Sequence, residues 1–327
     1  MKSHLNRLLP CLLLLSAVNG TLAREWTSRD GKKIEGEMVE LKGESVVLKI
    51  KTKKVTIPLN RLSDADAAFA REQASAPANY QIEGKEILPG QRTTVVIDFN
   101  DEEKKMARKA KDMPMQARLT FVLHDSFNPK GVNKFFFCRQ THDTKGEEGD
   151  TRAIGFFQET AKKHGWSLLV FDSPKGCIGS DTLDMATFAA GKRAMEQIWP
   201  GCLEQGIIGA GGISGGAKSS QNLLAIMSKQ GLKPKALFLS GCNAFTGNYF
   251  KEGYKVSPRI LSKVRVFISN GLSDTISTIA HAENVFDEMK KTGGVKEIKM
   301  DKYEGGHGPS KASLEKAFTW FDELAEK

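Results

Sequence analysis

The sequence is poor in cysteine, and its few cysteines are not arranged to bind a metal. Of the 5 cysteines in 327 residues, four follow residue 23, and no two of these have the spacing of a metal-ligand pair. A basic stripe with interleaved aromatic residues is also lacking, because the lysines lie scattered beside glutamates and the net charge is a mild +9. The sequence therefore predicts no metal, no cofactor and no nucleic-acid partner.

Long hydrophobic runs are absent too. The apolar run from Leu8 to Val18 has about 11 residues, whereas a membrane-spanning helix needs about 20. Lys2 and Arg7 precede this run and small residues follow it up to Ala23, which is the pattern of a secretory signal. We expect residues 1–23 to be removed and the mature chain to be secreted or periplasmic. An uncleaved anchor is the weaker alternative.

Residues 24–73 have the pattern of a small antiparallel β module. Alternating runs at residues 46–50 and 55–59 predict strands, and Asp30-Gly31 and Lys42-Gly43 predict turns. Residues 74–79, which are small, polar and include a proline, are expected to be a linker.

This module resembles the Sla homology domain, a small barrel-like unit. The matching residues are Trp26-Thr27, Gly31, Ile34-Glu35-Gly36, the paired valines before Leu48, Ile57-Pro58-Leu59, Leu62-Ser63 and Asp66. The resemblance implies a binding or spacing unit without catalytic groups, for which a protein or a surface is the candidate partner.

Residues 80–327 alternate strand-like and helix-like patterns. The expected strands are residues 94–99, 118–123, 134–138, 166–171, 206–210, 236–240, 264–269 and 296–303, and helical patterns include residues 156–164, 185–199, 217–230 and 278–291. Strands that alternate with helices predict an α/β fold, with an eight-stranded, mostly parallel sheet covered by helices on both faces.

The glycine-rich string at residues 209–220 is where chemistry is expected. Gly212-Ile-Ser214-Gly-Gly216 fits the G-x-S-x-G nucleophile elbow, in which a strand turns sharply into a helix and presents a serine. A dinucleotide fingerprint is the rival interpretation, but Ser214 stands where its third glycine should be, and the next strand does not end in an acidic residue. A glycine-rich turn without catalytic function also remains open.

A nucleophilic serine needs a histidine base and an acid, in the chain order Ser, Asp or Glu, His. His307 lies in a glycine-rich loop after the last expected strand, and Asp274 follows the seventh. We prefer this pair to His281, which lies within a helical pattern. Asp301 and Glu304 are weaker candidates for the acid because they lie close to His307 itself, and Asp274 has the alternative of merely capping the next helix.

With these motifs, residues 80–327 resemble the α/β-hydrolase superfamily, in the style of secreted esterases and polyester-depolymerase-like hydrolases. The resemblance implies Ser214 as nucleophile, His307 as general acid and base, and Asp274 as the residue that orients His307. It implies a carboxylic-ester substrate, small or carried on a polymer, and an acyl-enzyme intermediate. The alternative is a catalytically inactive hydrolase fold that acts as a binding protein.

The oxyanion hole departs from the family pattern. The third strand is followed by Arg139 and Gln140 and not by His-Gly, so a backbone N–H of one of these would have to join that of Gly215. Leu123-His124-Asp125 is disfavoured, because its carboxylate would lie beside a developing negative charge. The strand order of the resembled fold also favours a disulfide between Cys138 and Cys177. The absence of any disulfide is an equal alternative.

Overall fold

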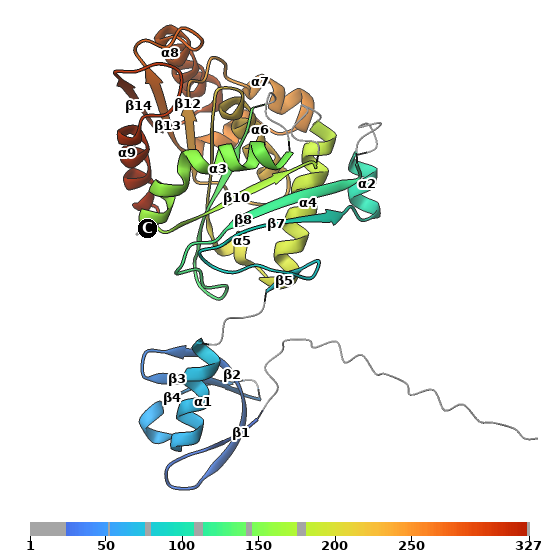
Figure 1. The fold of residues 1–327 in the computed structure, drawn as a ribbon, viewed down its shortest axis with the longest axis vertical. Coiled ribbons are helices and arrows are strands. Elements are labelled where there is room, and N and C mark those ends of the chain that lie inside the picture. Colours follow the sequence, from blue (N-terminus) through green and yellow to red (C-terminus); the bar gives the residue numbers. More distant parts are fainter. Residues whose placement is uncertain are drawn as a thin grey trace, which may run out of the picture. The chain divides into compact units, whose positions relative to one another are not determined.

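The computed structural model describes residues 24–51, 53–75, 80–107, 114–141, 146–174 and 181–325. The expected signal segment, most of the expected linker and Cys177 lie outside the described residues. The chain divides into two compact units, Met1–Ala78 and Asn79–Lys327. Each is described by itself (Figure 1).

The first unit is a four-stranded antiparallel sheet with one helix. The strands β1 (Arg24–Thr27), β2 (Lys33–Lys42), β3 (Ser45–Ile50) and β4 (Lys53–Pro58) lie in that order, and the turn η1 (Leu59–Arg61) leads to α1 (Asp64–Ser75). Trp26 is fully buried and donates a hydrogen bond from Nε1 to the carbonyl of Gly36 at 3.0 Å. The two expected turns have glycines with positive φ, Gly31 and Gly43.

The second unit is built on an eight-stranded sheet. Its strand order is β14-β13-β12-β11-β9-β10-β8-β7, in which β8 is antiparallel to both of its neighbours and the other neighbours are parallel. All eight expected strands are present, as β7 (Arg92–Asp98), β8 (Gln116–Val122), β9 (Lys134–Arg139), β10 (Trp166–Asp172), β11 (Ile207–Ile213), β12 (Ala236–Ser240), β13 (Arg265–Gly271) and β14 (Glu297–Tyr303). The expected fold class is confirmed.

Helices cover both faces of this sheet (Figure 1). The helices α3 (Gly146–Lys163) and α9 (Lys311–Asp322) pack on one face, and α4 (Asp181–Ile198), α6 (Gly215–Lys229) and α8 (Ile279–Glu288) pack on the other. Shorter elements are β5 (Gln81–Ile82), β6 (Lys85–Glu86), α2 (Asp101–Ala107), α5 (Cys202–Gln205), α7 (Gly247–Tyr249), η2 (Phe250–Tyr254), η3 (Pro258–Lys263) and η4 (Met289–Gly293).

The alternation of side chains along β9 shows why its sequence is apolar throughout. Phe135 and Phe137 are buried in the cluster under α4 and α6, whereas Phe136 and Cys138 are buried in the cluster under α3 and α9. A strand covered on both faces needs apolar residues at every position. The ring of Phe136 lies 4.9 Å from that of Phe157 and 5.0 Å from that of Phe318, between centroids.

The prediction of a disulfide between Cys138 and Cys177 is wrong. Cys138 is a free thiol, as are Cys202 and Cys242, and all three are buried. Its side chain points into the apolar cluster under α3 and not towards the edge of the sheet where Cys177 was expected. Burial raises the pKa of the Cys138 thiol well above its usual value, and raises those of Cys202 and Cys242 to about 12 and about 11.

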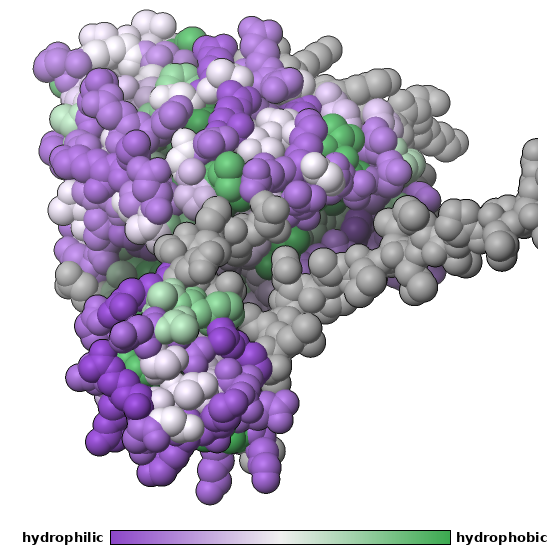
Figure 2. Space-filling view, turned by 60° about the horizontal axis from the view of Figure 1, so that its bottom comes forward, coloured by the Kyte–Doolittle hydropathy of each residue, from purple (hydrophilic) through white to green (hydrophobic). Residues whose placement is uncertain are grey.

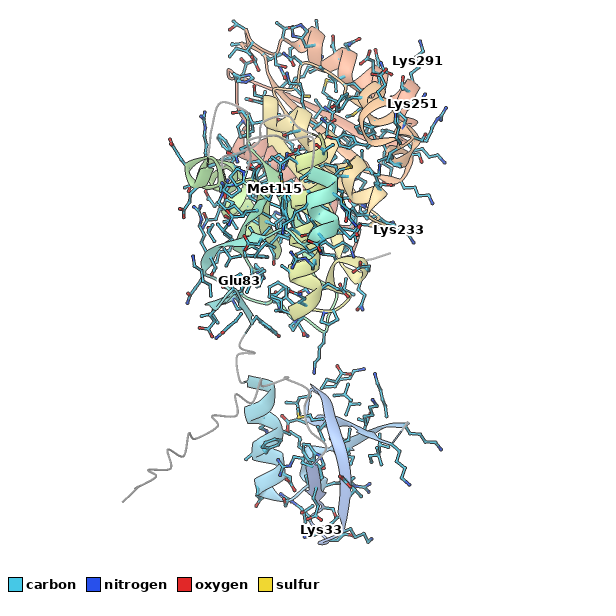
Figure 3. The ribbon with its side chains drawn as sticks, turned by 90° about the vertical axis from the view of Figure 1, so that its right-hand side faces the viewer. Lys33, Glu83, Met115, Lys233, Lys251 and Lys291 are labelled. Atoms are coloured by element: carbon cyan, nitrogen blue, oxygen red, sulfur yellow. The ribbon has the colours of Figure 1, made fainter. Side chains whose placement is uncertain are left out.

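The surface is predominantly hydrophilic in the view of Figure 2, with hydrophobic residues gathered only in small groups. Lysines on outer helices and loops, such as Lys233, Lys251 and Lys291, extend away from the ribbon (Figure 3). Within the described ranges, none of the helices has the length and hydrophobicity that a bilayer-spanning segment requires.

Gly211 gives a test of the packing between β11 and Phe136. A Cβ at this position would lie 2.5 Å from Phe136 Cζ and 2.9 Å from the carbonyl oxygen of Phe238. We expect Gly211→Ala to lower the free energy of unfolding by about 1 to 3 kcal/mol in urea titrations, because the core is overpacked. Gly155→Ala on α3, where nothing lies within 4 Å, is the control and should raise it by about 0.5 to 1 kcal/mol. Equal effects of the two substitutions would contradict the packing argument.

Candidate active site

Ser214 lies at the turn between β11 and α6, in a backbone conformation that few side chains adopt. Its φ is 58° and its ψ is −121°, and it is the N-cap residue of α6. β11 continues to Ile213, three residues beyond the expected end, so the strand leads directly into the serine. The Ser214 amide donates to the carbonyl of Ser240 on β12 at 2.9 Å, which ties the turn to the neighbouring strand. Positive φ at a non-glycine residue is a strain that concentrates at functional sites.

The glycines on each side of Ser214 allow three backbone segments to meet. A Cβ on Gly212 would overlap the backbone of Gly216, and a Cβ on Gly216 would overlap the carbonyl of Arg139 at the end of β9. The positions two before and two after the serine must therefore lack side chains. The same contacts bring the Arg139–Gln140 segment against the N-terminus of α6.

Asp274 and His307 form a hydrogen-bonded pair at the same edge of the sheet. His307 Nδ1 lies 2.8 Å from Asp274 Oδ2, and the carboxylate side chain is inaccessible to solvent. The other oxygen, Oδ1, accepts hydrogen bonds from the amides of Ile276 and Ser277, each at 2.8 Å. Burial acts to raise the pKa of Asp274, but the amide of Ser277, the His307 imidazole and the amide of Ile276 outweigh it, and the pKa is lowered from its ordinary value.

The loop that bears His307 is anchored by hydroxyl groups that sequence reasoning missed. The Tyr303 hydroxyl donates to the carbonyl of Gly308, and Ser240 Oγ donates to the same carbonyl at 3.0 Å. Gly241, with φ of 55°, lies directly against the imidazole: a Cβ there would be 2.8 Å from His307 Cε1. The positive φ after β12 and the absent side chain make room for the histidine.

Ser214 and His307 line one cavity of about 380 Å³. Its lining residues are Arg139, Gln140, Thr141, Gly149, Arg152, Ala153, Phe156, Ile213, Ser214, Ile276, His307 and Gly308. Arg139 and Gln140, the two predicted backbone donors to the oxyanion, therefore border the same space as the serine, and Gly215 is the residue after it. Among the described residues, no hydrogen bond joins the Ser214 hydroxyl to His307.

The rejected candidates have other partners. His281 is exposed and takes part in the capping box of α8 with Thr278. Asp301 accepts hydrogen bonds from Ser313 at 2.5 Å and from Lys316 at 2.7 Å, which hold α9, and Glu304 is exposed. Asp274 does not cap α8, because Thr278 is the N-cap residue.

The segment after β8 lies away from this cavity. Since β8 runs antiparallel, its end pairs with the first half of β10, with Val122 opposite Leu168. His124 and Asp125 there line a separate cavity of about 60 Å³. The segment after β8 lies away from the cavity because β8 is antiparallel to its neighbours, a direction that sequence patterns do not reveal.

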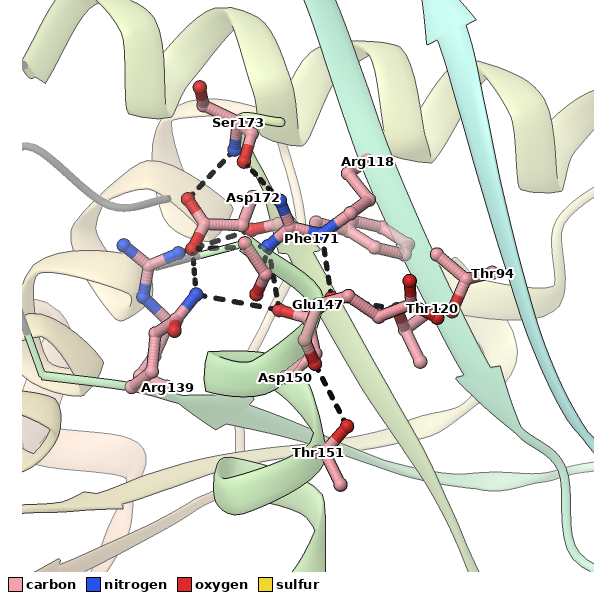
Figure 4. A network of polar contacts seen from close by, with 12 residues as sticks. Thr94, Arg118, Thr120, Arg139, Glu147, Asp150, Thr151, Phe171, Asp172 and Ser173 are labelled. Atoms are coloured by element: carbon pink, nitrogen blue, oxygen red, sulfur yellow. Dashed lines mark hydrogen bonds and ion pairs between the residues drawn. The ribbon is translucent and has the colours of Figure 1, made fainter. Parts of the chain in front are cut away.

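A buried ionic network lies behind the Arg139–Gln140 segment (Figure 4). Arg118 donates from Nε and Nη2 to the two oxygens of Asp150, at 2.8 and 2.9 Å. The Gln140 amide donates to Asp172 and, at 3.4 Å, to Asp150. A Cβ on Gly149 of α3 would overlap the Gln140 amide, so the helix makes room for it. The side chain of Gln140 is thus fixed by groups outside the cavity.

Counted along the chain, the strands of the large sheet lie in the order 1-2-4-3-5-6-7-8, with the second reversed. Ser214 follows the fifth strand at a strained turn, Asp274 the seventh and His307 the eighth. This is an α/β-hydrolase fold. The order and the directions of the strands decide the assignment: strands five to eight are parallel, so the turns after strands five, seven and eight lie at one edge of the sheet.

Comparisons with known proteins add little to this. No protein-family model matches the chain, and no curated protein is similar to it in sequence. Among solved structures, it is similar to a cold-adapted esterase from an Arctic intertidal metagenomic library (12% identity, 73% of this chain and 96% of that chain, TM-score 0.48). An esterase of Pyrococcus furiosus (13%, 72% and 88%, 0.44) and dipeptidyl peptidase 4 of Porphyromonas gingivalis (14%, 92% and 41%, 0.46) are also similar. Since these TM-scores are below 0.5, the fold assignment rests on the topology alone.

Gly241→Ala tests whether the position of the His307 imidazole depends on the absence of a side chain at residue 241. A left-handed alanine costs about 1 to 2 kcal/mol wherever it occurs, but only at position 241 would it displace the imidazole. We expect the low-field ¹H NMR signal of the proton between His307 and Asp274, assigned by its loss in His307→Gln, to shift or disappear. The matched control is Gly231→Ala, with φ of 84° and nothing within 4 Å. An unchanged signal in Gly241→Ala would show that the histidine does not depend on this glycine.

Asp172 gives the fold a pH dependence. Burial raises its pKa from 3.8 to about 6, although Arg139 and Arg118 partly oppose this. The folded state therefore binds the proton more tightly, so the contribution of Asp172 to stability is full below about pH 4 and is lost as the pH rises through about 6. We expect Asp172→Asn to remove a fall of about 2 kcal/mol from the wild-type profile of unfolding free energy over that range. Parallel profiles for the two proteins would contradict this.

Proposed function

We propose that the chain is a serine hydrolase that cleaves carboxylic esters through an acyl-enzyme. The observation that carries the proposal is the strained backbone of Ser214, on a cavity that it shares with a histidine already paired to a buried carboxylate. A structural serine at such a turn would not need either the imidazole or the strain.

The geometry supports a reaction in two steps. Nε2 of His307 takes the proton of the Ser214 hydroxyl as Oγ attacks the ester carbonyl, and then gives that proton to the departing alcohol. Water, deprotonated by the same imidazole, attacks the acyl-serine, and the proton returns to Ser214 Oγ as the acid is released. Asp274 remains ionised, since its pKa is lowered, and stabilises the imidazolium. Hydrogen bonds of catalytic groups are often long without substrate, so the Ser214 hydroxyl need only rotate or shift to reach the base.

The oxyanion of the tetrahedral intermediate is expected to accept hydrogen bonds from the backbone N–H of Gly215 and from that of Arg139 or Gln140. Arg139 and Gln140 border the cavity, as does Ser214, which directly precedes Gly215. The N-terminus of α6 adds its positive dipole end. One such donor contributes a rate factor of about 10² to 10³.

The remaining proposals rest on the sequence. Residues 1–23 are proposed as a secretory signal, and the mature protein as secreted or periplasmic. Residues 24–73, with the pattern of the Sla homology domain, are proposed as a unit that binds a protein or a surface.

Labelling with a fluorophosphonate probe tests the proposed nucleophile. We expect purified residues 24–327 to be labelled, and labelling to be lost in Ser214→Ala but kept in Ser228→Ala, which changes a serine at the far end of the same helix. His307→Gln and Asp274→Asn should lower kcat/KM on nitrophenyl esters by about 10⁴-fold or more. A folded wild-type protein that is never labelled would instead be a catalytically silent binding protein.

A further inference from the structure

The described residues that line the cavity beside Ser214 carry charge of one sign. Arg139 and Arg152 are among them, and none of these described residues is acidic. The guanidinium of Arg139 is buried and engaged, because it donates to Asp184 and to the carbonyl of Phe171, both at 3.2 Å. Arg152 is exposed, and within the part of the chain that the structure describes it forms neither an ion pair nor a hydrogen bond.

Arg152 belongs to one face of α3 that borders the cavity. The lining residues of this helix are Gly149, Arg152, Ala153 and Phe156, which are spaced three and four positions apart. Residues at this spacing lie on the same side of a helix. The guanidinium therefore extends from the wall of the cavity, on a helix whose first turns are fixed by the buried Arg118–Asp150 pair.

Apolar side chains complete the lining. Phe156 and Ile213 border the same cavity as the serine, and Ile276 is 59% exposed although it is a large hydrophobic residue. A ligand that covered this surface would bury apolar area at one place and meet a cation at another. This combination fits an amphiphilic ester better than a purely aliphatic one.

We propose that Arg152 binds a carboxylate of the substrate, so that the preferred substrates are esters with an apolar body and a free carboxylate near the scissile bond. This rests on the proposed hydrolase function. A guanidinium matches the planar geometry of a carboxylate with two parallel hydrogen bonds. The net charge of +9, which is +7 without Lys2 and Arg7 of the proposed signal, adds long-range attraction for such anions.

The test compares esters that differ only in one charge. Mono(4-nitrophenyl) adipate and its methyl ester carry the difference on the acyl side, and 4-acetoxybenzoate and its methyl ester carry it on the alcohol side. For at least one pair, we expect the ratio of kcat/KM for the anionic to the neutral ester to fall about tenfold in Arg152→Gln, mainly through KM. The pair that responds shows on which side of the bond the carboxylate lies.

Lys162→Gln is the matched control, because it removes one charge from the same helix at a lysine outside this cavity. It should leave both ratios unchanged, whereas Arg152→Lys should lose part of the preference since lysine cannot form the paired hydrogen bonds. Ratios that are equal in wild type and Arg152→Gln for both pairs, with the neutral esters still hydrolysed, overturn the assignment of Arg152 but leave the hydrolase proposal intact.

A binding measurement makes the assignment independent of turnover. In Ser214→Ala, the calorimetric titration uses monomethyl and dimethyl adipate as one pair, and 4-acetoxybenzoate and its methyl ester as the other. The monoanion should bind more tightly in at least one pair, and Arg152→Gln should abolish the difference. If no ester is cleaved and no fluorophosphonate reacts, the hydrolase proposal fails, and this titration still decides the role of Arg152. Equal or undetectable binding within both pairs overturns it.

Discussion

The close approach of three backbone segments around Ser214 is the constraint on which the rest of the candidate site depends. Gly212 and Gly216 leave no room for a side chain where β11, α6 and the end of β9 meet. The serine is consequently held at positive φ, its amide bonded to β12, and its hydroxyl at the cavity. A turn packed this tightly cannot relax by small steps, because any added atom meets main chain and not a movable side chain.

A buried ionic network holds the Arg139–Gln140 segment of the cavity wall in place. Arg118 and Asp150 lie almost wholly inside the protein and satisfy each other with two hydrogen bonds, and Gln140 joins them through Asp172. Loss of Arg118 would leave Asp150 buried without the cation that balances its charge, which costs far more than the pair contributes. The segment after β9 and the first turns of α3, which follow each other closely in the chain, are therefore also linked through their side chains.

The sequence was enough to predict the strands, the fold class and four of the residues that line the cavity, Arg139, Gln140, Ser214 and His307, because alternating and helical periodicities and the G-x-S-x-G motif are local signals. Contacts between distant segments were not accessible. The helical pattern of the sequence begins ten residues after the start of α3, because the first turns of this helix contain glycines and acidic residues in place of an apolar stripe. These turns supply Gly149 and Arg152. The role of Gly241 depends on a histidine 66 positions away. The predicted disulfide at Cys138 fails because the alternation of side chains along β9, and not only the strand order, decides which face of the sheet Cys138 points to.

The three described cysteines are all buried thiols. Cys138, Cys202 and Cys242 are enclosed by apolar neighbours and hold their protons far above neutral pH. Thiolates are the reactive species, so these sulfurs are chemically silent while the fold is intact. These three residues contribute to the fold as buried thiols and not as cross-links, so their part of the architecture does not depend on an oxidising compartment to form a bond.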